Sequence, residues 1–216
     1  MSAEPHTPSA PFWRSRRSAA IAGILFSLLL MAAMIMMRLA LSEDSLESLR
    51  ADDTRRTLIR LSLNLVPFAG IAFLWFIGVV RERLGEIEDR LFSTVFLGSG
   101  LLFLAMLFVG AVSASNLMEM LAGSNVNADV WAFGRDNAQA LISVYALRMA
   151  AVFTLSVSTV SLRAGAVPSW VLYVGYLAAL VLLLAGSEQK WAQLVFPAWV
   201  LLLSVTILIS RAPRRA

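Results

Sequence analysis

The chain has 216 residues, of which 59% are hydrophobic and 15% charged, and its mean hydropathy is +0.76. This composition excludes a soluble globular domain, because the surface of such a domain would be too apolar to be hydrated. Apolar segments take up most of the length, so there is no room for a separate catalytic domain outside the membrane. The net charge of +4 does not indicate nucleic-acid binding, since the basic residues stand at the ends of apolar runs, and there is no cysteine for disulfides or thiolate metal sites.

Six apolar runs of about 20 residues predict an all-α, polytopic membrane protein with six transmembrane helices in one bundle. We expect a disordered cytoplasmic N-terminus over 1–17, which is polar and rich in proline, and a basic cytoplasmic tail over 211–216. The transmembrane domain between them covers 18–210. Its expected spans lie at about 18–41, 61–80, 91–116, 138–162, 168–185 and 191–210.

The basic residues set the expected orientation of these spans. With the amino end inside, ten basic residues lie on the cytoplasmic side and six in the outer connections, in agreement with the positive-inside rule. We therefore expect both termini in the cytoplasm and multi-pass insertion into the cell (inner) membrane. Lys190 is the only lysine, and this preference for arginine hints at a bacterial source.

The second and third spans carry residues that alter helix geometry. Asn64 and Pro67 stand in the outer third of the second span, where the proline cannot donate to the Leu63 carbonyl and leaves it as an available acceptor. The third span contains Gly98. It also contains Gly110 and Ala114 at a spacing of four, which lets two helices approach closely.

Part of this region resembles a known group of proteins. The stretch from Arg81 through Leu107, centred on EDRLFSTVFLGSGLLFLAMLF, looks like uncharacterised bacterial six-helix integral membrane proteins. That group has no assigned activity. The resemblance therefore implies a bacterial integral membrane protein and no mechanism.

The start of the fourth helix is predicted from a capping signal. Asp136 and Gln139 have the spacing of a capping box, in which two side chains satisfy backbone N–H groups at a helix start. This places a loop over 119–137 and the helix after it.

The fourth span contains Arg148 well inside it, whereas Arg38, the other charge within an expected span, lies near the end of the first span, where it can reach the interface. An arginine at this depth costs about 3 kcal/mol on insertion scales, so we expect it to face the bundle interior with a partner, on the same helix face as Tyr145. The alternative is a structural arginine that bonds a nearby carbonyl or extends toward the interface. Ala150, Thr154 and Ser158 form a second row at four-residue spacing, suited to close helix packing.

The fifth and sixth spans complete the candidate sites. Gly175 and Ala179 form another pair of small residues in the fifth span, and Pro197 stands in the outer third of the sixth. At about 1.5 Å per residue, Arg148, Pro67 and Pro197 fall in one layer. The candidate anion or ligand pocket therefore comprises Arg148, Tyr145, Asn64, Pro67 and Pro197.

Two functions are compatible with the sequence. The first is binding or transport of an anionic or amphiphilic small molecule or lipid through the arginine in the fourth span. The second is a non-catalytic accessory or structural role, in which the helices pack against a membrane partner or another copy of the chain. Catalysis, a metal and a cofactor are not expected, because the spans contain no Asp, Glu, His or Cys.

Overall fold

The computed structural model describes residues 12–40, 49, 52–84, 90–121, 127–165, 167–184 and 191–209. The predictions for residues 1–11 and for the tail at 211–216 lie outside this part of the chain. All elements in the described residues are helices, which confirms the all-α fold class. In chain order they are α1 (Phe12–Ala40), α3 (Asp53–Leu84), α4 (Arg90–Leu121), α5 (Ala128–Ala140), the π-helix η1 (Leu141–Ala146), α6 (Leu147–Ala164), α7 (Ser169–Leu184), the short 3₁₀ helix η2 (Ala192–Leu194) and α8 (Val195–Ile209).

Five helical stretches among the described residues are long and apolar enough to cross a membrane. They are Ser18–Ala40, Asp53–Arg81, Ser93–Leu121, Ala128–Ala164 and Ala192–Ile209. The predicted fifth span corresponds to α7, which is apolar but has only 16 residues, about 24 Å of helix. A hydrocarbon core is about 30 Å thick, so α7 by itself is too short to cross it.

Helices α1, α3 and α5 begin earlier than the sequence predicted, and α1 begins at Phe12, within the stretch 1–17 that was expected to be disordered. Asp52 precedes α3, and its side chain accepts hydrogen bonds from the backbone N–H groups of Thr54 (2.9 Å) and Arg55 (3.1 Å). Asn127 caps α5 in the same way, accepting from the N–H of Asp129 at 2.8 Å. The predicted start at Asp136 was therefore wrong, because a capping residue nine positions earlier satisfies the free N–H groups of the first turn.

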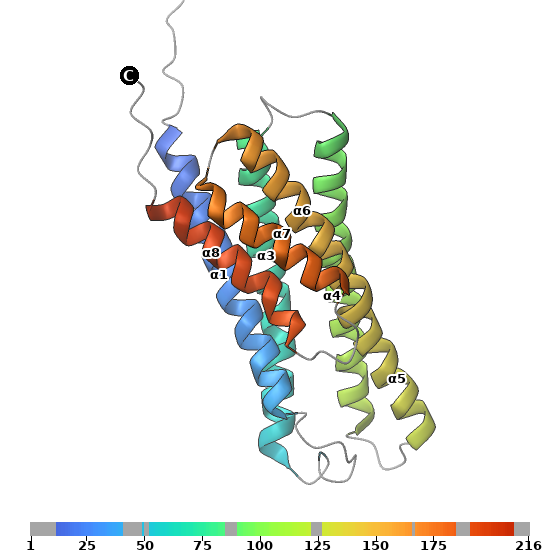
Figure 1. Ribbon diagram of the computed structural model, residues 1–216. Helices are drawn as coiled ribbons and strands as arrows, with labels where there is room; N and C mark the ends of the chain where they lie inside the picture. The colour runs from blue at the N-terminus through green and yellow to red at the C-terminus, as the bar shows by residue number, and fades with distance from the viewer. Residues whose placement is uncertain are drawn as a thin grey trace, which may run out of the picture.

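The helices run alternately up and down (Figure 1), and their contacts close them into a circle. Each packs against its two neighbours in the order α1, α3, α4, α6, α7 and α8, and α8 returns to α1. In Figure 1 the lower end of the bundle is where α1 and α4 end and where α3 and α5 begin. At this end, the guanidinium carbon of Arg38 lies 3.6 Å from the centre of the Trp191 ring, a cation–π contact that ties α1 to the start of the last helix.

The middle of the circle is filled by phenylalanine side chains. α1, α3, α4, α6 and α8 all contribute to this cluster, and each ring is at most 1% exposed. Neighbouring ring centres lie 4.5–6.4 Å apart, the range of favourable aromatic packing. The phenylalanine cluster consists of Phe26, Phe73, Phe76, Phe96, Phe103, Phe153 and Phe196.

Candidate functional site

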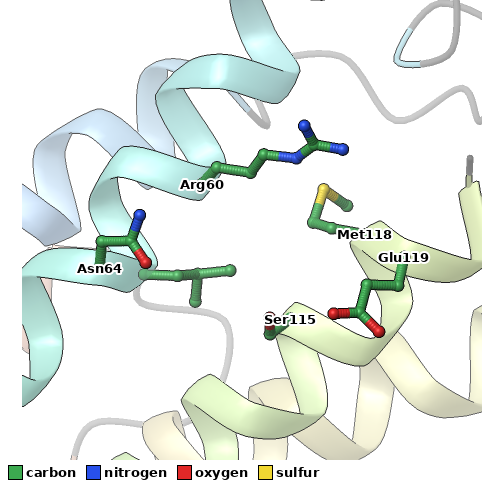
Figure 2. A pocket seen from close by; sticks show the side chains of 6 residues that line it. Arg60, Asn64, Ser115, Met118 and Glu119 are labelled. Atoms are coloured by element: carbon green, nitrogen blue, oxygen red, sulfur yellow. The ribbon is translucent and has the colours of Figure 1, made fainter.

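A pocket of about 280 Å³ opens between α3 and α4 at the lower end of the bundle (Figure 2). α3 supplies Arg60, Leu63 and Asn64, which lie one turn apart on one face of the helix. Across from them, α4 supplies Ser115, Met118 and Glu119 with the same spacing. The two helices are antiparallel, so the beginning of one and the end of the other meet at this pocket.

Opposite charges line the two sides of the pocket. Arg60 extends from α3 and Glu119 from α4, and both side chains are exposed (Figure 2). The ion pairs recorded among the described residues, Arg55 with Asp52 and Arg56 with Asp53 included, do not join these two. The pocket therefore presents one cation and one anion to an incoming molecule.

The remaining lining residues add uncharged polar groups and apolar walls. Asn64 and Ser115 bring an amide and a hydroxyl, while Leu63 and Met118 bring carbon and sulfur surface. Pro67, one turn farther along α3, has no N–H to donate to the Leu63 carbonyl. This leaves a backbone acceptor on a residue that lines the pocket.

The five residues predicted to form one pocket are distributed over different environments. Asn64 lies in the pocket between α3 and α4, whereas Pro67 is exposed on α3 and Pro197 is buried in α8. Tyr145 is 58% exposed. Arg148 is exposed as well, so the prediction that its side chain faces the bundle interior needs correction.

Arg148 bonds to its own helix. Its Nη1 donates a hydrogen bond of 3.0 Å to the carbonyl oxygen of Val144, within the π-helix that precedes α6. In the same π-helix, Ser143 Oγ accepts a hydrogen bond of 2.7 Å from the side-chain Nε2 of Gln193. A guanidinium has five N–H donors, so the Val144 contact uses one of them.

The small residues predicted to mediate helix packing have unequal surroundings. Ala150, Thr154 and Ser158 are fully buried in α6, and Ala179 is fully buried in α7. A Cβ on Gly175 would overlap the Ser158 hydroxyl.

The third span shows the same variation. A Cβ on Gly110 would lie 2.6 Å from the Ile142 side chain, and Ala114 is half-buried. Gly98, by contrast, has nothing within 4 Å of an added Cβ. Only some of these small residues thus mark a close helix contact.

Buried hydroxyl groups mostly bond within their own helices. Ser27 donates to the Gly23 carbonyl at 2.7 Å, and Thr154 donates to the Ala150 carbonyl at 2.8 Å. Ser158 Oγ and Ser204 Oγ are buried with no partner recorded in the described part of the chain. The same part contains no group of three or more His, Cys, Asp or Glu side chains placed to hold a metal ion.

Comparison of the chain with protein-family models, with curated proteins and with solved structures finds no match. The geometry of the bundle and of its lower end therefore provides the evidence on function.

Proposed function

We propose that the chain is a multi-pass membrane protein that binds the head of a zwitterionic amphiphile in the pocket between α3 and α4. The observation that carries this proposal is the pair Arg60 and Glu119, two exposed and opposite charges on facing sides of one pocket. A phospholipid head with a phosphate and an ammonium group has the complementary charges. Arginine binds phosphate oxygens through two parallel N–H groups, and a carboxylate accepts from an ammonium.

The size and the position of the pocket support a head group as the ligand. Its volume of about 280 Å³ is at the lower limit of small-molecule sites. This volume accommodates a head group, while the acyl chains would lie outside along exposed apolar residues such as Leu61 and Phe68 of α3. Arg60 and Arg81 bracket an α3 segment of roughly 30 Å, the thickness of a hydrocarbon core, which sets the pocket at a membrane surface.

The excess of arginine at the opposite end of the bundle supports an outward-facing pocket, with both chain termini in the cytoplasm. The phenylalanine cluster favours binding over transport, because it fills the centre of the helix circle where a path would run. Insertion in the inner membrane of a bacterium is part of the same proposal.

Binding of short-chain phosphatidylethanolamine to the purified protein in neutral detergent, measured by native mass spectrometry, tests this function. Arg60→Ala and Glu119→Gln should each weaken binding about tenfold, the size of one charged hydrogen bond. Arg56→Ala is the matched control, since Arg56 already bonds Asp53 at 2.9 Å and does not line the pocket. Phosphatidylglycerol has no ammonium group. If it binds as tightly as phosphatidylethanolamine, Glu119 does not recognise the head group. Unchanged binding by folded Arg60→Ala would overturn the proposal.

A second function, assembly with other membrane proteins, is favoured by a separate observation. Arg148 and Tyr145 are exposed together on the outside of the bundle, within the apolar stretch Ala128–Ala164. A polar pair in that position is more typical of a helix contact than of a lipid-facing surface.

A further inference from the structure

The side of α6 that carries Arg148 is exposed at the level of the hydrocarbon core. Asp136 and Arg163, the charged residues nearest to Arg148 along the helix on either side, are each roughly 20 Å away. An arginine side chain extends several Å, so its guanidinium stays within the core whichever way it turns. The single bond to the Val144 carbonyl leaves most of its donors unused.

The described part of α7 leaves the side chains of Arg148 and Tyr145 exposed. α7 packs antiparallel on α6, with Gly175 against Ser158 and with the Tyr176 hydroxyl 3.0 Å from Thr159 Oγ1. Gly175 lies opposite Ser158, and Leu184 follows Gly175 by nine residues. Because the two helices are antiparallel, Leu184 lies near the level of Met149, which precedes Ser158 by nine residues. The described part of α7 therefore ends at about the level of Arg148.

The π-helix also shapes this surface. In the segment Leu141–Ala146 one extra residue is accommodated per turn, so the backbone pattern of the α-helix is interrupted immediately before Arg148. Such segments occur often at functional sites. Here the segment presents the Val144 carbonyl to the guanidinium, and the side chain of Tyr145, in the same segment, is exposed.

The charge on this surface restricts what can cover it. An arginine in hydrocarbon pairs with an acidic side chain or with backbone carbonyls, because leaving it unpaired costs about 3 kcal/mol, and the Val144 carbonyl occupies only one of its five donors. A second copy of the chain would bring a second arginine, since every Asp and Glu of the sequence lies outside the six expected spans. A lipid phosphate lies about 15 Å from the middle of the bilayer, beyond the reach of the side chain.

We infer that the surface formed by Arg148 and Tyr145 binds the transmembrane helix of a different protein, one that carries an aspartate or glutamate in the middle of its span. The carboxylate accepts two N–H groups of the guanidinium and the hydroxyl of Tyr145. The exposed apolar side chain of Leu155, two turns farther along α6, packs against the same helix. This inference does not depend on the lipid pocket between α3 and α4.

A designed single-span peptide of leucine and alanine with one central glutamate tests this inference. Association of the labelled peptide with the full chain in vesicles of neutral phosphatidylcholine is measured by energy transfer. The glutamate peptide should bind about tenfold more tightly than its leucine counterpart, a typical effect of polar contacts between membrane helices. Arg148→Leu should abolish this difference and Tyr145→Phe should reduce it, whereas Arg81→Leu, an exposed arginine at the end of the apolar segment, should retain it.

A charge exchange makes the test independent of folding. The Arg148→Glu variant should no longer bind the glutamate peptide and should bind a matched peptide with a central arginine. An unfolded variant could not show this new binding. The inference fails if Arg148→Leu binds both peptides as the native chain does. It also fails if anionic lipid added to the vesicles abolishes the preference, because the partner would then be a lipid.

Discussion

The centre of the bundle and its lower end are built from opposite kinds of residue. In the centre, phenylalanines from five helices pack at ring distances of 4.5–6.4 Å. At the lower end, α3 and α4 leave a pocket of about 280 Å³ with a cation on one side and an anion on the other. The contrast favours a centre that supplies stability, and the proposed function assigns ligand binding to the periphery.

The largest expected effect tests the role of the centre. Phe73 contacts Phe26, Phe103, Phe153 and Phe196, so Phe73→Ala should leave a cavity among five helices. We expect it to lower the free energy of unfolding by about 3–5 kcal/mol. Thermal or denaturant unfolding in detergent, followed by circular dichroism, measures the change.

Phe68→Ala on the same helix is the matched control, because Phe68 is 62% exposed. Its effect should be within about 0.5 kcal/mol. Similar losses in the two variants would mean that the centre contributes no more than the outer surface, and the contrast between the two regions would fail.

The next effect tests how closely the helices around the centre approach. A Cβ on Gly23 of α1 would overlap Ser204 of α8 and lie 2.9 Å from the Phe76 ring. Gly23→Val should therefore cost about 1–3 kcal/mol through overpacking. The same unfolding measurement checks this value.

Gly98→Val provides the comparison, since an added Cβ there meets nothing within 4 Å. It should leave the stability nearly unchanged. A loss at Gly98 equal to that at Gly23 would show that a general effect of valine in a helix, rather than contact between α1 and α8, is responsible.

The sequence predicted the helices better than their ends. Runs of apolar residues identify membrane-length helices because burying backbone polar groups requires continuous hydrogen bonding. The start of α5 was missed because Asn127 and Asp136 carry equally good capping side chains. Which of the two caps the helix depends on whether the residues between them are helical. These residues pack along α4, where Gly134 lies against Leu117.

The candidate pocket could not be predicted from the sequence for a related reason. Arg60 and Glu119 were both assigned to outer loops, and their meeting across the pocket depends on how α3 packs on α4. The helix face on which Arg148 lies was predicted from the periodicity of a regular α-helix. The π-helix before Arg148 interrupts that periodicity. Asn64 was identified because a polar residue in an apolar run is visible without knowledge of helix packing.

The third effect concerns the lower end itself. The Asn127 side chain accepts from the N–H of Asp129 at 2.8 Å, so Asn127→Ala should cost about 1 kcal/mol through loss of the helix cap. Hydrogen exchange over the first turn of α5 should rise in the variant. Asn116→Ala, at an exposed position inside α4, is the control and should leave this exchange unchanged.

The smallest effect has the opposite sign and concerns hydroxyls buried near the centre. Ser204 Oγ of α8 is buried against Gly23 of α1 and has no hydrogen-bond partner among the described residues. Ser27 Oγ of α1, by contrast, donates to the Gly23 carbonyl at 2.7 Å. An unpaired buried hydroxyl carries a desolvation cost that is not recovered by a hydrogen bond, so Ser204→Ala should raise the free energy of unfolding by up to about 1 kcal/mol. Ser27→Ala should lower it by about 0.5–1 kcal/mol, because it removes a bond. Both variants remove one hydroxyl group, so a loss of packing alone would change the free energy of unfolding in the same direction in both. Opposite changes would therefore identify hydrogen bonding as the cause. A loss of stability in Ser204→Ala would mean that its hydroxyl has a partner, and the centre would then contain a polar contact between helices.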